Sequence, residues 1–340
     1  MISPSWHQFL TDLGGAVAAD GDVSGLGGQI SPAAPYLCPL PAYALISATG
    51  DEAQAFLHGQ FTSDVNHLPE GRLQHSAWCT AKGRIYASML LWHLAGNEFE
   101  LLVAADLLPA MLKRLKMYVL RSKVVLAEKT DQVILGLGGQ GATALLQAAG
   151  LTLPAEPLTY ATFEGGRVAR LEGEERFLLV VEESAAATWW QKLSAHAHPA
   201  DSAVWRLGDV AAGIPWVCLA TQEAFIPQMV NFERIGGVSF HKGCYPGQEV
   251  VARTQYLGKV KRSLFRGISP LPVAPGQPLV TPDMEDGASG QVVSGAPDAQ
   301  GQWHFLAVLP ESWQGRPVHL GDKEGAVVTL SPVAPEEPAA

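Results

Sequence analysis

Residues 225–253 read FIPQMVNFERIGGVSFHKGCYPGQEVVAR, and this stretch carries the most distinctive pattern in the chain. The adjacent glycines Gly236 and Gly237 predict a turn. Cys244 then stands between Gly243 and a Tyr-Pro-Gly sequence that ends at Gly247. Small residues on both sides allow backbone or a ligand to come close to the thiol. The pattern therefore predicts a cysteine in a tight loop.

The neighbours of Cys244 favour a reactive thiol. His241 and Lys242 precede it, and their positive charge could stabilise the thiolate, which is the nucleophilic form. Gln248 and Glu249 open a predicted helix, and Arg253 would lie on the same helical face as Glu249 and could pair with it. A buried, inert cysteine in a turn is the alternative interpretation.

Composition limits the classes of protein to consider. A length of 340 residues predicts two or three domains. A content of 47% hydrophobic and 16% charged residues excludes a mainly disordered chain. We expect neither a transmembrane helix nor a secretory signal, because no apolar run is long enough for the first and no basic segment precedes an apolar one at the start. The four cysteines form no C-x-x-C pair, which favours reduced thiols in a cytoplasmic protein.

The net charge and the distribution of charge along the chain indicate different kinds of partner. The net charge of −10 disfavours DNA and acidic membranes as partners. However, two stretches without acids, 107–127 and 250–282, together hold 10 of the 23 Lys and Arg residues. They are either two solvated faces or an electropositive surface for an anionic ligand, such as a polyglutamylated cofactor or an RNA backbone. Charge alone leaves both interpretations open.

Hydrophobic periodicity predicts an α+β fold with mixed antiparallel sheets. The connection at 95–97 between two strand-like runs predicts a hairpin, which favours antiparallel α+β over a doubly wound parallel sheet. Helices are predicted at 3–17, 51–60, 107–120, 142–149 and 184–195, and strands at 43–48, 84–92, 98–104, 124–128, 133–137 and 176–181.

Composition also changes along the chain. Residues 1–36 predict an amphipathic helix on a flexible Gly-, Ser- and Pro-rich tether, outside the main α+β region at 37–254. Residues 255–331 contain short apolar runs separated by turns, which predict a small β-barrel. Residues 332–340 predict a disordered tail.

A glycine motif at residues 133–142, VILGLGGQGA, has the G-x-G-x-x-G spacing of a dinucleotide site. Such a site needs a second strand that ends in an acid to bind ribose. The chain instead has Pro154 and Pro157, which are unfavourable in a central strand. A tight strand-to-helix turn without a ligand is the preferred interpretation.

The HKGCYPGQE sequence at 241–249 resembles the K-G-C-[FY]-x-G-Q-E signature of the YgfZ family of folate-binding proteins, which are relatives of the glycine cleavage T-protein. The resemblance covers about residues 40–330. It implies a T-protein-like fold in which 37–254 forms two interleaved lobes around a tetrahydrofolate cleft, followed by a C-terminal β-barrel. Supporting matches are LHGQFTSDV at 57–65, CTAKGR at 79–84, LKMYVLRSKV at 115–124 and AGIP at 212–215.

The resemblance also implies a function. Tetrahydrofolate or a one-carbon derivative would be the cofactor, and the protein would support iron–sulfur cluster assembly or repair in the cytoplasm. Iron–sulfur proteins or their assembly factors would be its partners. A link to tRNA would be indirect, through client enzymes that thiomethylate tRNA.

Two kinds of site residue follow from the resemblance. Cys244 and Lys242 are the candidate catalytic residues. Tyr43, at a position where Trp is usual in the family, and Trp205 are implied folate contacts, although Trp205 could equally be a core aromatic residue. The cysteine segment adds further candidate folate contacts, namely Gln228, Asn231, Gln248, Glu249 and Arg253. No metal ligands are predicted.

Two other functions remain as alternatives. Aminomethyl transfer, the T-protein activity, relies on a pair of acids, but Ala87 and Ser88 stand at the positions that the resemblance assigns to them. A non-catalytic, folate-gated adaptor would bind folate without modifying it. The lysines that could hold a glutamate tail or a partner are Lys82, Lys116 and Lys123.

Overall fold

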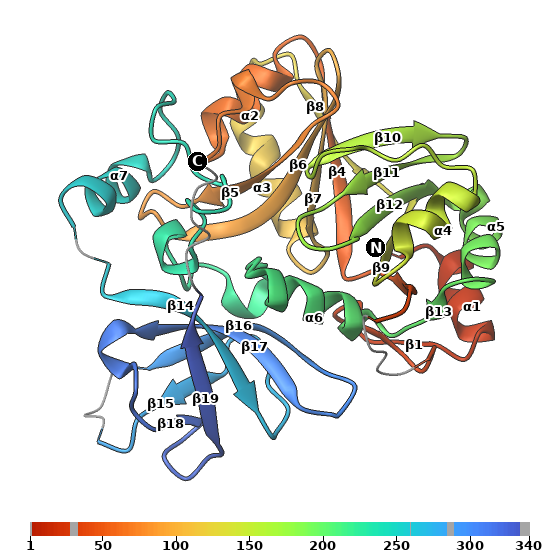
Figure 1. The fold of residues 1–340 in the computed structure, drawn as a ribbon. Helices are drawn as coiled ribbons and strands as arrows, with labels where there is room; N and C mark the ends of the chain where they lie inside the picture. The colour runs from red at the N-terminus through yellow and green to blue at the C-terminus, as the bar shows by residue number, and fades with distance from the viewer. Residues whose placement is uncertain (1, 28–32, 259, 284–288, 334–340) are drawn as a thin grey trace. The chain divides into compact units, whose positions relative to one another are not determined.

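The computed structural model describes residues 2–27, 33–258, 260–283 and 289–333 (Figure 1). Contacts divide the chain into two compact units that alternate along the sequence. The first unit consists of Met1–Gln54, Leu68–Gln74 and Leu90–Gly208. The second consists of Ala55–His67, His75–Met89 and Asp209–Ala340.

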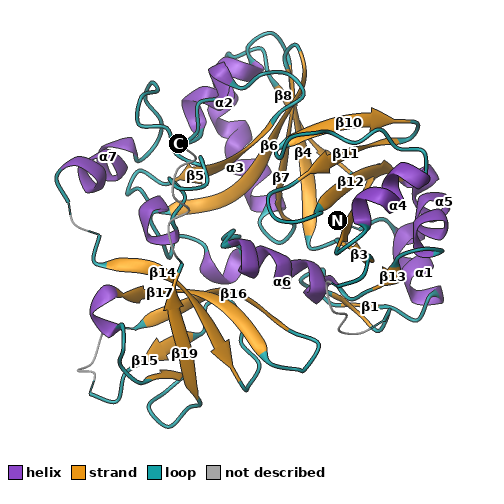
Figure 2. Cartoon of the chain, viewed as in Figure 1, coloured by secondary structure: helices purple, strands orange, loops and turns teal. Residues whose placement is uncertain are grey.

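The first unit contains a six-stranded sheet with the order β10-β11-β12-β9-β3-β13 (Figure 2). Its neighbouring strands are antiparallel except for the short pair β13–β3. Strand alternation sends Leu135 and Leu179 to one face, where α4 (Ala142–Ala148) and α5 (Glu183–Ser194) cover them. The strands are β3 (Tyr36–Pro39), β9 (Gln132–Gly138), β10 (Thr159–Phe163), β11 (Gly166–Arg170), β12 (Phe177–Glu182) and β13 (His198–Pro199).

The N-terminal helix belongs to this core, so the expectation of a tethered appendage is wrong. Helix α1 spans Pro4–Asp12, with Ser3 as its N-cap. Trp6 and Leu10 are buried in the same cluster as Trp190 of α5, and the two indole rings meet edge to face at 6.1 Å. The helix is shorter than predicted because Gly14 follows with φ +90°.

The stretch predicted to be a tether is part of the first unit where the structure describes it, at residues 20–27 and 33–35. It forms the two-stranded sheet of β1 (Ala16–Val17) and β2 (Val23–Ser24). Asp22 pairs with Arg206, and the Leu26 N–H donates to Asp201 at 3.0 Å. The stretch that the sequence predicted as a linker therefore makes an ion pair with α6 (Ser202–Ala212) and a hydrogen bond to Asp201, the residue before this helix. Residues 28–32 of the predicted tether lie outside the described residues.

A five-stranded sheet has the order β5-β6-β7-β4-β8. The predicted hairpin is confirmed, since β6 ends at Ala95 and β7 begins at Glu98. Helix α3 (Leu108–Val119) buries Leu108, Met111 and Leu115, as its periodicity predicted. The strands are β4 (Tyr43–Thr49), β5 (Leu73–Cys79), β6 (Ile85–Ala95), β7 (Glu98–Ala104) and β8 (Val125–Lys129).

The predicted C-terminal barrel is also confirmed, as a closed barrel with the order β14-β17-β16-β15-β18-β19. Phe265, Phe305 and Leu309 fill its core. Contacts place it in one compact unit with 55–67 and 75–89, rather than in a domain of its own. Its strands are β14 (Arg262–Ser269), β15 (Pro278–Val280), β16 (Gly290–Pro297), β17 (Trp303–Pro310), β18 (Val318–Leu320) and β19 (Val327–Pro332).

Residues 334–340 of the predicted tail lie outside the described residues. Within the described part of the chain, no helix is long and apolar enough to cross a membrane.

The glycine motif has a packing role. A Cβ on Gly136 would lie 2.3 Å from the Trp205 ring, and one on Gly138 would lie 2.6 Å from the Tyr36 hydroxyl. At the start of α4, Glu175 accepts hydrogen bonds from the N–H groups of Gly141 and Ala142. A carboxylate therefore occupies the helix N-terminus where a pyrophosphate would bind, and the antiparallel neighbours of β9 exclude a βαβ unit.

Candidate functional site

The four cysteines differ sharply in exposure. Cys38 and Cys79 are buried, Cys218 is half-buried and Cys244 is exposed. Burial raises the pKa of the Cys79 thiol to about 12, and burial also raises the pKa of Cys38 strongly. Since a thiolate is the reactive form, the two buried thiols are inert. The exposure of Cys244 disfavours the alternative of a buried, inert cysteine, and its reactivity stays a prediction.

Lys242 is held by three backbone carbonyls. Its ammonium donates to the carbonyl oxygens of His58, Phe61 and Ser63, the last two at 2.5 and 2.9 Å. Burial lowers the pKa of Lys242 to about 8, and the charge of Asp64 opposes this shift. An ammonium has three N–H donors, so these carbonyls use all of them. The side chain thus ties the cysteine loop to the residues that follow α2 (Ala53–Gln60).

Glycine shapes the other end of the loop. Gly247 has φ +82° and precedes α7 (Gln248–Tyr256). A Cβ at Gly247 would lie 2.3 Å from the Thr80 carbonyl oxygen, in the turn between β5 and β6. Gln248 donates across the loop from Nε2 to the Gly243 carbonyl at 3.4 Å. Cys244 therefore stands in a loop that is bonded on both sides.

The predicted Glu249–Arg253 pair is present, with 3.5 Å between the charged atoms. Both side chains are largely exposed, at 88% and 72%. An exposed pair of this kind is weak, so both groups remain available to a ligand.

Gln228 and Asn231 lie in a buried segment, η3 (Pro227–Val230) and its C-cap. Gln228 is 5% exposed, and its Nε2 donates to the Val251 carbonyl of α7 at 2.8 Å. Among the described residues, its Oε1 has no hydrogen-bond partner. Asn231 is 6% exposed and adopts φ +57°, a conformation that Asn tolerates well.

Tyr43 and Trp205 belong to the first unit, whereas the other candidates belong to the second. Trp205 is 2% exposed and packs between Gly136 and Arg176, whose guanidinium lies 4.4 Å from the ring centroid. This environment favours the core-aromatic interpretation of Trp205. Its role as a folate contact stays a prediction.

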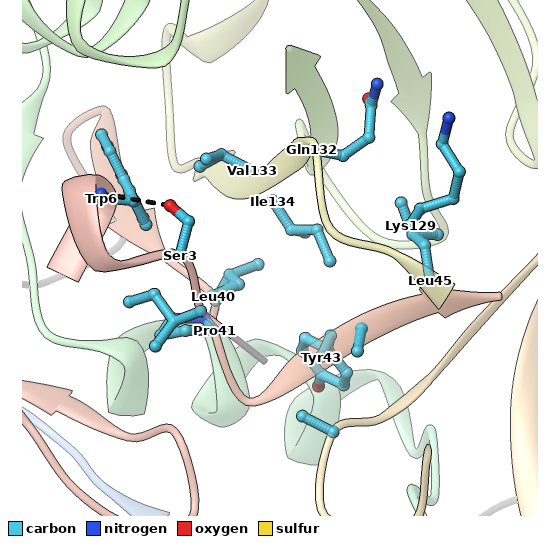
Figure 3. A pocket seen from close by; sticks show the side chains of 13 residues that line it. Ser3, Trp6, Leu40, Pro41, Tyr43, Leu45, Lys129, Gln132, Val133 and Ile134 are labelled. Carbon is cyan, nitrogen blue, oxygen red and sulfur yellow. Dashed lines mark hydrogen bonds between the residues drawn. The ribbon is translucent and has the colours of Figure 1, made fainter. Parts of the chain in front are cut away.

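Tyr43 is half-buried at the start of β4 and lines a small cavity of about 40 Å³. Figure 3 shows Trp6 of α1, Ile134 of β9 and Tyr43 around it. A cavity of this size accommodates a few water molecules, and nothing in it identifies a pterin site. The folate contact of Tyr43 therefore also stays a prediction.

The positions of the T-protein acid pair hold no carboxylate. Ala87 and Ser88 are buried in β6, and the Ser88 hydroxyl accepts a hydrogen bond from the Val217 N–H at 2.8 Å. The lysines considered for a glutamate tail, Lys82, Lys116 and Lys123, are exposed. The described residues form no cluster of three or more His, Cys, Asp or Glu that could hold a metal ion.

One group of polar residues was missed in the sequence. His58, Asp64 and His67 lie together beside the cysteine loop, with His58 Nδ1 3.3 Å and His67 Nδ1 2.8 Å from the Asp64 carboxylate. The signal was the LHGQFTSDV stretch itself, which contains His58 and Asp64 six residues apart. Its chemistry depends on a contact with residues about 180 positions later, which local sequence does not reveal.

The fold defines the class of protein. The structure is similar to the glycine cleavage system aminomethyltransferase T from Bartonella henselae, with a TM-score of 0.74 over 97% of this chain and 96% of that one. At 18% identity this likeness concerns the fold. Residues 41–205 match the GCVT N-terminal domain family. The chain thus has the fold of the glycine cleavage T-proteins.

Closer relatives identify the family. The chain is 36% identical over 233 residues to the tRNA-modifying protein YgfZ of Pectobacterium carotovorum, covering 68% of this chain and 70% of that one. It is 34% identical to the tRNA-modifying protein YgfZ of Yersinia pseudotuberculosis, covering 67% and 69%. The chain therefore belongs to the YgfZ family, as the cysteine signature indicated.

Proposed function

We propose that this chain is a tetrahydrofolate-binding protein that supports iron–sulfur cluster assembly or repair, and thereby tRNA modification, through the thiol of Cys244. The observation that carries the proposal is an exposed cysteine in a loop held by Lys242, Gly247 and Gln248. A rigid loop is not needed for an inert surface cysteine, but it positions a reacting thiol. The relatives named above are described as tRNA-modifying proteins.

The polar groups of the second unit suit a folate. Gln228 Oε1 is a buried acceptor with no partner among the described residues, and so is Glu233 Oε2. Burial raises the pKa of Glu233. An unsatisfied buried acceptor is costly, and the amino and amide N–H groups of a pterin are donors that could satisfy it. Bound tetrahydrofolate would supply one-carbon chemistry.

Among the alternatives, aminomethyl transfer has the least support. Deprotonating the amine requires a positioned base, and Ser88 offers a hydroxyl that already accepts a backbone hydrogen bond. An adaptor that binds folate without changing it remains the alternative to compare. We expect the protein to act in the cytoplasm, where thiols stay reduced.

The role of the thiol is tested by complementation. In cells that lack the endogenous gene, Cys244→Ser should fail to restore thiomethylated tRNA and iron–sulfur enzyme activity. The matched control is Cys218→Ser, which changes a half-buried thiol of the same unit and should restore both. Full activity of Cys244→Ser would overturn the proposal.

Folate binding is tested by calorimetry with tetrahydrofolate. Gln228→Met should weaken binding by about tenfold, equivalent to about 1.4 kcal/mol. The control is Gln222→Met, since Gln222 also donates one hydrogen bond to a backbone carbonyl, that of Tyr86. Equal affinity of the two variants for tetrahydrofolate would show that Gln228 is not part of the folate site. Mass spectrometry of the folate after incubation distinguishes an enzyme, which modifies the folate, from an adaptor, which leaves it unchanged.

A further inference from the structure

We infer that the end of α3 is a docking site for an acidic segment of a partner protein, which places an apolar side chain against Leu120. The residues that form the docking site all lie in the first unit. The inference goes beyond the proposed function, because it requires neither folate nor the Cys244 thiol.

Three large side chains with apolar surface are exposed where α3 ends, before β8 (Figure 1). Met117 is 63% exposed, Tyr118 43% and Leu120 87%. Leu115 of the same helix is buried, so the helix is covered by the protein on one side only. Single exposed apolar residues are common, but several neighbouring ones mark an interaction site.

Leu120 is held in a conformation that a leucine disfavours. Its backbone has φ +46° and ψ −103° at the C-cap of α3. A bulky residue with positive φ is an outlier, and such strain is concentrated at functional sites. Glycine would adopt this φ without strain, and the exposed side chain buries little surface in the fold. Stability of the fold therefore does not explain a leucine at this position.

An open hollow lies beside Leu120 and has a volume of about 620 Å³. It is lined by Glu52, Tyr118, Val119, Leu120, Arg121 and Ser122. Small-molecule sites enclose most of their ligand, whereas this hollow is open to solvent. It suits an apolar side chain that projects from the surface of a partner.

The side chains around the hollow are basic. Lys113, Lys116 and Arg121 are exposed, and none of them forms an ion pair with another described residue. Lys113 and Met117 are four positions apart in α3, so they lie on the same face of the helix. The positive charges and the exposed apolar side chains therefore belong to one surface.

Two acids lie nearby, and both are bonded to Lys123. The Lys123 N–H donates to the Glu52 carboxylate at 2.7 Å, and the Lys123 ammonium pairs with Asp51 at 3.4 Å. Lys113, Lys116 and Arg121 thus remain available to the carboxylates of a partner. Charge complementarity selects an acidic partner segment.

The mixture of side chains favours a protein over RNA or a membrane. Protein interfaces have an apolar centre with a polar rim, and Met, Tyr and Arg are enriched in them. RNA contacts use phosphates and stacked bases and would leave Met117 and Leu120 in water. A membrane-binding helix inserts a continuous apolar face, but α3 buries its apolar face in the protein.

Fluorescence anisotropy with the full-length protein tests the inference. The probes are three matched sets of labelled peptides, in which a leucine or phenylalanine is flanked by glutamates, by lysines or by serines. We expect the glutamate peptides to bind most tightly and their affinity to fall as salt is added. Equal affinity for the three sets would overturn the inference.

Two variants locate the binding. Arg121→Glu should weaken binding of the glutamate peptides by at least about tenfold. The matched control is Lys192→Glu, which reverses an exposed charge on α5 of the same unit and should change the affinity by less than about twofold. Leu120→Gly should weaken binding by at least about fivefold without lowering the thermal midpoint, because glycine relieves the strain. Unchanged binding in both Arg121→Glu and Leu120→Gly would overturn the inference.

Other occupants of the surface are separate outcomes, and each would also overturn the inference. One is a dimer in sedimentation that Arg121→Glu abolishes. Another is binding of phosphatidylglycerol vesicles or bulk tRNA that is tighter than peptide binding and is lost in Arg121→Glu. Cys244→Ser should bind the peptides like wild type, so failure of the docking site and failure of the proposed function are distinguishable.

Discussion

At the scale of single residues, Lys242 connects two segments that lie about 180 positions apart in the chain. Its ammonium donates to three carbonyls of the segment after α2. We predict that Lys242→Met lowers the free energy of unfolding by about 2 kcal/mol, because the carbonyls lose a charged donor. Urea denaturation measures it, with the exposed Lys113→Met as a control expected within about 0.5 kcal/mol of wild type. Equal stability of the two variants would show that the three Lys242 hydrogen bonds do not stabilise the fold.

Gly136 presents a different single-residue constraint, the close approach of an aromatic ring. We predict that Gly136→Ala destabilises the protein by about 1–3 kcal/mol, because the new methyl group overlaps the Trp205 indole. Gly59→Ala is the matched control, since nothing lies within 4 Å of its Cβ and it lies within helix α2. That variant should be more stable by about 0.5–1 kcal/mol. Thermal unfolding of both variants measures this, and we expect the midpoint to fall in Gly136→Ala and to rise in Gly59→Ala.

The same contact explains why Trp205 was difficult to assign from sequence. A tryptophan near a family motif suggests ligand stacking, but whether a ring is exposed depends on its partners in space. Here the partners are Gly136 and Arg176, distant in sequence from Trp205. By contrast, the Glu249–Arg253 pair follows from the local spacing of four residues on a helix, and that prediction is confirmed.

At the scale of elements, α4 depends on a carboxylate from another loop. Glu175 accepts hydrogen bonds from the first N–H groups of α4, and these bonds lower its pKa although burial opposes them. We predict that Glu175→Gln lowers the unfolding free energy by about 1 kcal/mol at pH 7. Because the folded-state pKa lies below the ordinary value of 4.5, the difference should be complete above pH 4.5 and vanish as the pH falls through the lowered pKa.

The adjacent exposed Glu174 provides the control for this measurement. Guanidinium denaturation of Glu174→Gln at several pH values should give curves parallel to those of wild type. A pH-independent loss in Glu175→Gln would indicate that the side chain acts through packing instead of charge.

Helix α1 tests the revised view of the N-terminus. We predict that Trp6→Ala lowers the unfolding free energy by about 3–5 kcal/mol, because the indole fills the core next to Trp190. Leu13→Ala, which changes a side chain that is 44% exposed, should have little effect. Calorimetric midpoints near the wild-type value for both variants would restore the tethered-helix interpretation.

Elements with strong periodicity were predictable and irregular ones were not. Helix α3 and strands β4, β6, β7 and β9 appear close to their expected bounds. Strands β3, β10 and β11 were missed, because Pro39 and Gly166 are unfavourable in strands, β10 is only five residues long, and partner strands supply the missing preference. Helix α6 was also missed, since it contains Gly208 and its Trp205 ring packs against Gly136 of β9, which is distant in sequence.

At the scale of the whole molecule, charge separates a direct role at tRNA from an indirect one. The chain carries −10 overall, and its two basic stretches fall in different units. We predict no binding of bulk tRNA tighter than a Kd of about 1 µM at 150 mM salt, since non-specific contacts alone give weaker affinities. Filter binding measures this, and a submicromolar Kd would argue for direct contact with tRNA.

The barrel was predictable as a whole because short strands with turns at regular spacing are a local signal. The division of the chain was harder. The sequence suggested a barrel outside the α+β region, whereas contacts join the barrel to residues 55–67 and 75–89. Such grouping depends on long-range packing, which composition along the chain does not encode.

The three bonds of Lys242 also determine when, during synthesis, the cysteine loop can be completed. They join residues 179 to 184 positions apart. A ribosome that adds 5–20 residues per second needs roughly 10–40 seconds to make the intervening chain. The carbonyls of residues 58–63 lack the Lys242 ammonium during that time. The cysteine loop is therefore completed only when about three-quarters of the polypeptide has been made. A nascent chain stalled just before that point contains every residue of the first unit, but it lacks the cysteine loop of the second.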